Sequence, residues 1–191
     1  LKNNDPQTFL FSYLLKNYLS NNSKLSNFIK NYFDTSLKTN YITSFTNQFD
    51  FENFHFAKFS SVINLKKIND IRYINKFFES INDLLPYSGL YLGLVVTYPS
   101  RRATIYKKYP PILNRLIYFI DFIFSRVSPK LPIIKKLYFF LTKGKGRVMS
   151  RAETFGRLYS CGFEIVDEKI INNLLYFVAK KIKEPHFDNN P

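Results

Sequence analysis

The alternation of hydrophobic and polar positions is clearest over residues 150–184. Ser150 and Glu153 have the spacing of a capping box, which predicts the start of a helix. Three large apolar residues follow at helical spacing: Phe155, Leu158 and Tyr159. Gly162 can adopt the left-handed conformation that commonly ends a helix. Both ends of this helix are therefore predicted from local signals.

Two strands are predicted to follow this helix. Residues 163–171 alternate at first and then become apolar, and residues 174–182 form a second apolar run that includes lysines at its end. Asn172 and Asn173, which lie between the two runs, are typical of a tight turn. The carboxyl end of the chain is thus predicted to be a helix followed by an antiparallel hairpin.

A strand, a helix and a second strand are predicted between residues 59 and 98. Residues 59–65 indicate a short apolar strand, residues 66–70 a polar crossover, and residues 71–85 a helix. The core face of this helix is predicted to hold Ile71, Ile74, Phe77, Phe78, Ile81 and Leu85. Residues 90–98 are almost uninterrupted apolar, as is typical of a parallel strand covered on both faces. The order indicates a crossover unit of an α/β sheet.

The amino-terminal part, residues 1–58, has weaker patterns. Residues 6–19 and 25–33 have helical spacing, residues 40–46 favour a strand, and residues 47–58 have no clean period. We expect this part to be irregular and mainly helical.

Positive charge is concentrated in an insertion, residues 99–150, that separates the crossover unit from the closing helix. The whole chain has 28 Lys and Arg against 14 Asp and Glu, a net charge of +14. Residues 98–151 contain thirteen of these cations and one acid, Asp121, so this stretch carries +12. Such a charge favours an anionic partner: a membrane surface, nucleic acid or a phosphorylated substrate. An AT-rich genome would also enrich a chain in lysine without any such partner.

Two apolar segments lie in the insertion. Residues 112–127 predict an amphipathic helix with a very broad apolar face, and its narrow polar stripe consists of Asn114, Tyr118, Asp121 and Ser125. Residues 133–141 form the second apolar segment, which precedes the flexible and basic residues 143–147. Neither segment has the ~20 uninterrupted apolar residues that a membrane-spanning helix needs.

Apolar helices flanked by cations are typical of chains that lie in the membrane interface. The residues predicted to face the membrane surface are Arg115, Arg126, Lys130, Lys135, Lys136, Lys143, Lys145 and Arg147. The alternative is a helical cap that packs on the sheet and is surrounded by solvated lysines. Nucleic-acid binding is a weaker interpretation, because the cations are interleaved with apolar residues and no nucleic-acid motif occurs.

No catalytic constellation is present in the sequence. The single cysteine, Cys161, excludes an internal disulfide and a cysteine-based zinc site, and is consistent with a reducing compartment. The two histidines, His55 and His186, have no carboxylates at ligand spacing. Three acids near a strand end are interpreted as solvated edge residues: Glu164, Asp167 and Glu168. We expect no metal and no cofactor.

With these elements placed, residues 59–183 resemble the carboxyl half of a class I S-adenosylmethionine-dependent methyltransferase. VINLKKIND and the helix after it are similar to the fourth strand and helix of that family, and LLPYSGLYLGLVV to the turn into the fifth strand. ETFGRLYSCGFEIVDE is similar to the last helix and sixth strand, and LLYFVAKK to the antiparallel seventh strand. The resemblance implies an α/β fold, namely a partial Rossmann-like sheet with a carboxyl-terminal antiparallel hairpin and a helical insertion.

The cofactor-binding half of that family has no counterpart here. The family binds its cofactor with a glycine-rich loop after the first strand, whereas the first glycine of this chain is Gly89. We therefore expect no tight binding of S-adenosylmethionine and assign no catalytic residue. The alternative is an active methyltransferase with an atypical pocket at Asn64 and Leu65, at the carboxyl end of the strand predicted over residues 59–65.

A second resemblance covers most of the chain. NLKKINDIRYINKFFESIN, the basic insertion, KGKGRVMSRAETFGRLYSCGFEIVDE and KEPHFDNNP are similar to the region before the catalytic domain of bacterial sugar transferases that assemble exopolysaccharide and capsule. The resemblance implies a non-catalytic, peripheral module at the cytoplasmic face of the inner membrane. Its partners would be the anionic membrane surface or a downstream polyprenyl-phosphate sugar-1-phosphate transferase domain. We expect residues 1–191 to be a single truncated methyltransferase-like domain and a fragment of a longer protein.

Overall fold

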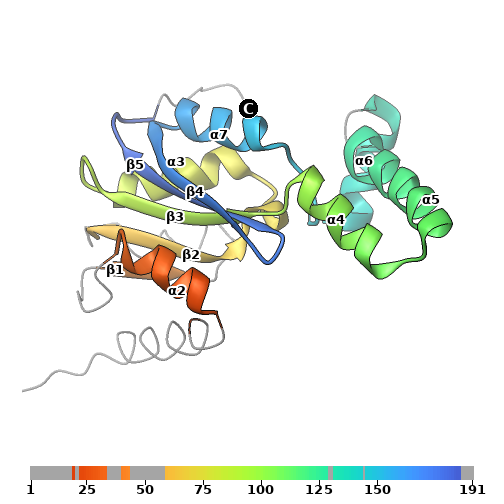
Figure 1. Ribbon diagram of the computed structural model, residues 1–191. Helices are drawn as coiled ribbons and strands as arrows, with labels where there is room; N and C mark the ends of the chain where they lie inside the picture. The colour runs from red at the N-terminus through yellow and green to blue at the C-terminus, as the bar shows by residue number, and fades with distance from the viewer. Residues whose placement is uncertain are drawn as a thin grey trace, which may run out of the picture.

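A five-stranded sheet forms the centre of the structure, with strand order β1-β2-β3-β5-β4 (Figure 1). Its strands are β1 (Asn40–Thr43), β2 (Ser61–Lys67), β3 (Leu90–Val95), β4 (Phe163–Ile171) and β5 (Leu174–Lys181). The first three strands are parallel, and β5 lies antiparallel between β3 and β4. The predicted α/β fold, a Rossmann-like parallel sheet closed by an antiparallel hairpin, is confirmed by this order.

This computed structural model describes residues 19, 22–33, 40–43, 59–128, 131–143 and 145–185. The helix predicted over residues 6–19 lies outside them except for Leu19, and so do the loop predicted over residues 47–58 and both histidines.

Helices cover both faces of the sheet. The helix α2 (Ser23–Lys30) packs on one face, and α3 (Ile74–Leu84) and α7 (Arg151–Ser160) pack on the other. Three further helices, α4 (Tyr98–Lys108), α5 (Pro111–Phe122) and α6 (Pro132–Thr142), project from one end of the sheet (Figure 1). We call these three helices, with the π-helical turn Ile123–Val127 after α5, the insertion lobe.

The central strand β3 supplies both cores. Tyr91 and Val95 are buried with α3 and α7, whereas Leu92 and Leu94 are buried with α2. The ring of Tyr91 also contacts three phenylalanines at centroid distances of 5.7 to 6.1 Å: Phe78, Phe163 and Phe177. The prediction that this strand is covered on both faces is confirmed, and all six residues predicted for the core face of the preceding helix are buried.

Local signals explain the closing helix and hairpin. The Ser150 hydroxyl accepts a hydrogen bond of 2.9 Å from the Glu153 amide at the start of α7, and Gly162 lies just beyond its end with a φ of +88°. Asn172 and Asn173 both have positive φ, 50° and 60°, as a two-residue hairpin turn with the right twist requires. These predictions are confirmed.

Several element boundaries differ from the prediction. Residues 66–70 are not a polar crossover, because β2 continues to Lys67 and the short 3-10 helix Ile68–Asp70 buries Ile68 and Asn69. The strand predicted over residues 90–98 ends at Val95, because the chain turns there into α4. Tyr159, predicted on the apolar face of α7, is instead half-exposed.

A buried lysine completes the end of α3. Lys181 lies on β5, and its ammonium donates hydrogen bonds of 2.9 and 3.0 Å to the carbonyl oxygens of Asn82 and Leu85. The last carbonyls of a helix have no partner within the helix, so a cation at this position satisfies them and interacts well with the helix dipole. The ammonium also pairs with Glu184 at 3.0 Å.

The turn after α7 should tolerate no side chain at Gly162. A Cβ there would lie 2.3 Å from the Lys183 carbonyl oxygen and 2.7 Å from the Asn82 amide nitrogen. We expect Gly162→Ala to lower the free energy of unfolding by about 2 kcal/mol or more, from backbone strain and steric overlap. Urea denaturation followed by circular dichroism measures the change.

Gly156 provides the matched control for this substitution. It lies in the middle of α7, is exposed, and a Cβ added to it would have no neighbouring atom within 4 Å. Gly156→Ala should therefore raise the free energy of unfolding by about 0.5–1 kcal/mol, because alanine favours the helix. Equal effects of the two substitutions would contradict the turn geometry.

Candidate functional site

The carboxyl ends of β2 and β3, where open α/β sheets bind ligands, are joined to each other by contacts within the chain. The buried side-chain amide of Asn69 donates to the Val96 carbonyl at 2.9 Å and to the Arg147 carbonyl at 2.8 Å, and its oxygen accepts from the Val96 amide at 2.6 Å. Thr97 forms a parallel bridge with Met149. The places where the insertion leaves the sheet and returns to it are thus joined side by side.

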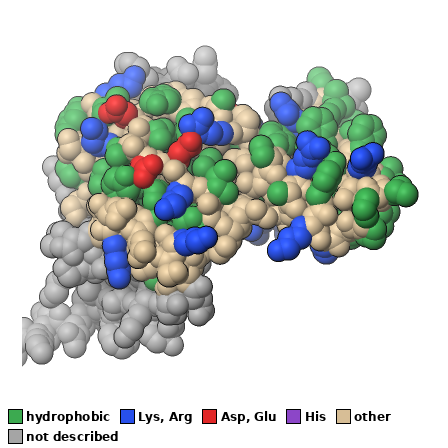
Figure 2. Space-filling model, viewed as in Figure 1, with side chains coloured by type: hydrophobic (Ala, Val, Ile, Leu, Met, Phe, Trp, Pro, Cys, Tyr) green, Lys and Arg blue, Asp and Glu red, His purple; other side chains and the backbone are tan. Residues whose placement is uncertain are grey.

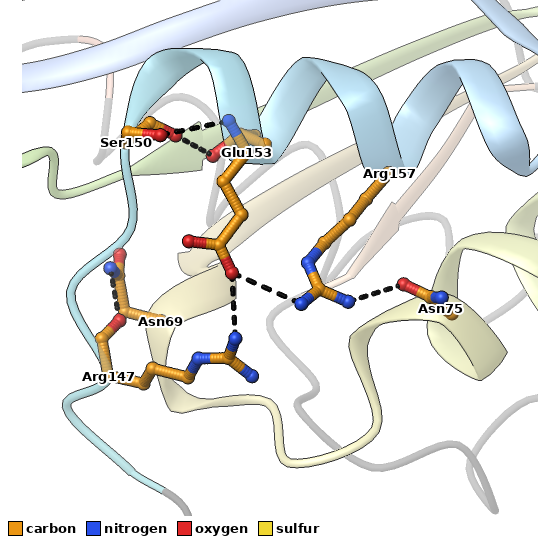
Figure 3. A network of polar contacts seen from close by, with 7 residues as sticks. Asn69, Asn75, Arg147, Ser150, Glu153 and Arg157 are labelled. Atoms are coloured by element: carbon orange, nitrogen blue, oxygen red, sulfur yellow. Dashed lines mark hydrogen bonds and ion pairs between the residues drawn. The ribbon is translucent and has the colours of Figure 1, made fainter. Parts of the chain in front are cut away.

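A polar network anchors the return of the insertion to α7 and α3 (Figure 3). The Glu153 carboxylate pairs with Arg147 at 2.7 Å and with Arg157 at 3.1 Å. Arg157 also donates to the side chain of Asn75 on α3 at 2.8 Å. Arg147, which the sequence predicted to face a membrane, therefore has its charge engaged by this network.

The predicted pocket residues Asn64 and Leu65 lie in the packed sheet. Asn64 is completely buried, and its side-chain oxygen accepts from the Lys66 amide at 2.9 Å. Its side-chain nitrogen and the hydroxyl of Tyr91 have no hydrogen-bond partner among the described residues. Burial raises the pKa of that hydroxyl, and the neighbouring Asn64 amide lowers it by less. Leu65 is half-buried and packs against the α2 side of the core.

A helix that the sequence reasoning missed, α4, begins the insertion lobe. Thr97 caps it by accepting from the Ser100 amide at 3.4 Å, and Pro99 stands in the first turn. Pro110 lies two residues after Lys108, the last residue of α4, and immediately precedes α5. A capping threonine, a proline in the first turn and a proline after the end are signals that could have predicted this helix.

The amphipathic helix α5 is present as predicted, but its polar stripe faces inward. Asn114 and Ser125 are 7% and 5% exposed, and Asp121 forms a two-point ion pair with Arg101 of α4, with one hydrogen bond of 2.8 Å. Tyr118 packs edge-on against Tyr106 of α4 at a centroid distance of 6.0 Å. The polar stripe therefore holds α5 to α4.

The broad apolar face of α5 is exposed as a consequence. The side chains on this face are 41% to 89% exposed, and they are Ile112, Leu113, Leu116, Phe119, Ile120, Ile123 and Phe124. Exposed apolar side chains continue beside and along α6: Leu131, Ile134, Phe140 and Leu141. A large exposed patch of this kind marks an interaction surface. The alternative prediction was a helical cap packed on the sheet. It does not account for the exposure of this apolar face.

Exposed cations lie among the apolar side chains of the insertion lobe on the face shown in Figure 2. Of the residues predicted to face a membrane, Arg115, Arg126, Lys136, Lys143 and Lys145 are exposed. Lys130 lies outside the described residues, and Lys135 lies in α6 with a side chain that is not described. Three further exposed cations belong to α4, which the prediction lacked: Arg102, Lys107 and Lys108.

An open groove lies between α4 and α5. Its volume is about 380 Å³, and it is lined by Tyr98, Pro99, Arg102, Ala103, Tyr106 and Tyr118. The guanidinium of Arg102 stacks over the rings of Tyr106 and Tyr118, with distances of 4.9 and 5.8 Å to their centroids. Arg126 stacks over Tyr98 at 4.5 Å. Cations and aromatic rings thus alternate along the contact between the two helices.

The three acids of the edge strand β4 have separate partners and form no acid–base pair. Glu164 pairs with Lys180 at 3.6 Å, and Glu168 pairs with Arg151. The Asp167 carboxylate accepts a hydrogen bond of 2.7 Å from the Tyr32 hydroxyl. Within the described ranges, no group of three or more His, Cys, Asp or Glu side chains could hold a metal ion.

No helix in the described part of the chain is long and apolar enough to cross a bilayer.

No protein-family model matches the chain, and no curated protein matches it. Among solved structures, an O-methyltransferase family protein from Burkholderia thailandensis is similar, with a TM-score of 0.41 and 16% identity over 72% of this chain and 34% of that chain. A possible exported protein from Bordetella parapertussis is similar with a TM-score of 0.35 and 13% identity, over 65% of this chain and 39% of that chain. The chain spans less than half the length of either structure. These likenesses are weak, so the fold assignment rests on the strand order.

Cys161 should behave as a core residue and not as a nucleophile. Burial raises the pKa of its thiol to about 11 from an ordinary value of 9.0. We expect iodoacetamide to leave the folded chain unmodified at neutral pH and to label it rapidly in urea, because the thiolate is the reactive form. Mass spectrometry measures the labelled fraction.

The same shift in pKa affects stability. The folded chain holds the thiol proton more tightly than the unfolded chain, so this contribution is complete below about pH 9 and is lost as the pH rises through about 11. Rapid labelling of the folded chain at neutral pH would show that Cys161 is accessible and that its pKa is not raised.

Proposed function

We propose that the chain is a non-catalytic, methyltransferase-like accessory module that binds an anionic membrane surface through its insertion lobe. The observation that carries this proposal is the orientation of α5, whose polar stripe packs inward and whose apolar face is exposed. Ile112 is 89% exposed and Phe140 on α6 is 79% exposed, although burial of such side chains is worth about 1.5–3 kcal/mol each. The lobe would recover this free energy on contact with an apolar phase.

The charge around the apolar face suits an anionic lipid surface. On the wheel of α5, Arg115 and Arg126 lie along one border of the apolar face, and the cations of α4 and the α6 end add to them. Each Lys or Arg near an anionic leaflet contributes about 1 kcal/mol to binding. A helix that lies in the interface presents this combination, with apolar side chains inserted and cations at the level of the phosphates.

Nucleic acid fits this surface less well than lipid does. A phosphate backbone would be met by a polar, basic face, whereas the exposed face of α5 is apolar over its whole length. A protein partner with an apolar, acidic groove would fit as well as lipid on charge alone. The vesicle experiment below distinguishes these cases, because only lipid binding depends on the composition of the vesicle.

The non-catalytic part of the proposal is supported by the carboxyl edge of the sheet. Asn69 and the returning residues 146–149 contact each other at the carboxyl ends of β2 and β3, where open α/β sheets bind ligands, and Asn64 of β2 is completely buried. The first glycine of the chain, Gly89, comes after both β1 and β2, so neither strand is followed by a glycine-rich phosphate loop.

The biological setting that we propose is more specific than these structural observations. It rests on the resemblance of the sequence to the region before the catalytic domain of bacterial sugar transferases. The module would belong to a bacterial sugar transferase of exopolysaccharide or capsule assembly, at the cytoplasmic face of the inner membrane. There it would hold a polyprenyl-phosphate sugar-1-phosphate transferase domain close to its lipid-linked substrate. Any coding sequence beyond Pro191 would test this setting directly, because the transferase motifs would be expected there.

We expect the chain to sediment with vesicles that contain phosphatidylglycerol, and to do so less when the salt concentration is raised, because salt screens the attraction. Ile120→Ser should weaken binding about fivefold or more, because it removes an inserted apolar side chain. Ile170→Ser, a matched exposed isoleucine on β4, should leave binding unchanged. Equal binding by the two variants would show that the apolar face of α5 does not contribute to vesicle binding.

Charge variants complete this experiment. Lys143→Gln with Lys145→Gln should weaken binding to anionic vesicles, while Lys24→Gln with Lys76→Gln, two exposed lysines on α2 and α3, should not. Binding that is the same for neutral and anionic vesicles would contradict the electrostatic half of the proposal.

Calorimetry with S-adenosylmethionine tests the non-catalytic half. We expect no saturable heat at millimolar concentrations of the cofactor, because the described sheet offers no glycine-rich amide cradle for it. The same titration with Asn64→Ala should give the same result, apart from a loss of stability. A saturable heat that Asn64→Ala abolishes in a folded chain would instead support an active methyltransferase with an atypical pocket.

A further inference from the structure

The groove between α4 and α5 has the composition of a binding site for an oxyanion. It has a volume of about 380 Å³, and three of its lining residues are tyrosines: Tyr98, Tyr106 and Tyr118. Its single charged lining residue is Arg102. The lining of the groove therefore combines aromatic rings with one cation.

Arg102 has no carboxylate partner among the described residues. The single acid of the insertion, Asp121, is engaged by the neighbouring Arg101 through two hydrogen bonds. Arg102 instead stacks over Tyr106 at 4.9 Å and Tyr118 at 5.8 Å. Stacking uses the flat face of a guanidinium and leaves its in-plane N–H donors available, and these donors match the geometry of a phosphate group.

The hydroxyl of Tyr98 would remain protonated at neutral pH. Burial raises the pKa of Tyr98, and Arg126, stacked over its ring at 4.5 Å, lowers it by less. A second cation therefore stands beside the groove without lining it. Two cations, one that lines the groove and one beside it, favour an anion with more than one negative charge over a carboxylate.

We propose that this groove binds a phosphate monoester, with Arg102 as the residue that recognises the phosphate. The inference deepens the proposed function, because the same lobe would carry the groove at the membrane surface. The phosphate could come from a lipid headgroup in the bilayer or from a soluble phosphate ester such as a sugar phosphate. Both present the same group to Arg102, and the experiment separates them.

The first arm of the experiment uses vesicles. Phosphatidic acid carries a phosphate monoester and phosphatidylglycerol a diester, so we expect tighter binding to phosphatidic acid at equal lipid charge. Arg102→Gln should remove this preference and weaken binding to phosphatidic acid about tenfold or more, as expected for charged hydrogen bonds. Arg115→Gln removes the same charge from the exposed surface of α5, outside the groove, and should keep the preference.

The second arm uses soluble probes. Glycerol 3-phosphate and glucose 1-phosphate are titrated by calorimetry into the wild-type chain, Arg102→Gln and Arg102→Lys. Binding of a soluble probe that Arg102→Gln abolishes supports the groove and shows that a bilayer is not required. Arg102→Lys should bind weakly, because lysine keeps the charge but neither stacks nor donates bidentately. Circular dichroism verifies that each variant is folded.

The outcomes separate this inference from the proposed function. Equal loss of binding in Arg102→Gln and Arg115→Gln would contradict phosphate recognition by the groove. It would indicate that the lobe binds anions through its general positive charge. Failure of the wild-type chain to bind any vesicle would overturn the proposed function, and the soluble probes would then decide the groove alone. No preference for phosphatidic acid together with no heat from either soluble probe would overturn the inference.

Discussion

The structure depends on one buried side chain, Asn69, which joins the two ends of the insertion to the sheet. Its amide group forms three hydrogen bonds, to both backbone groups of Val96 and to the Arg147 carbonyl, and all three lie within 2.9 Å. A buried amide left without these partners would cost about 1–3 kcal/mol for each unmade bond. The chain can therefore leave the sheet after β3 and return beside the same point. The lobe is thus an insertion whose two ends meet at one place on the sheet.

This junction also determines what the lobe can expose. Both ends of the lobe are fixed at one end of the sheet. The helix α4 therefore leads away from the core, and α5 packs against α4 rather than on the sheet (Figure 1). The contact between the two helices is made by the Arg101–Asp121 ion pair and by stacked rings and guanidinium groups. Polar groups are thus paired with each other inside the lobe. The apolar face of α5 is exposed to water or available to a partner.

The sequence predicted best the features that are specified by neighbouring residues. The cap at Ser150, the left-handed Gly162 and the asparagine turn are local signals, and each is where the pattern predicted it. The orientation of α5 was not predictable in this way, because periodicity identifies two faces but does not say which one meets water. Asn69 was also missed, because its partners lie 27 and 78 residues further along the chain. An asparagine in a stretch predicted to be a polar crossover carries no signal of such distant contacts.

The distribution of charge gives the two parts of the chain different roles. Residues 98–151 carry +12, so the remaining residues, with 15 cations and 13 acids, carry only +2. A chain divided in this way has a strong electric dipole, and an anionic surface would attract the lobe first and orient the sheet away from it. The apolar face of α5 and the groove of Arg102 both belong to the part that would arrive first. The sheet, which Asn69 joins to both ends of the insertion, would then hold the lobe in a fixed direction.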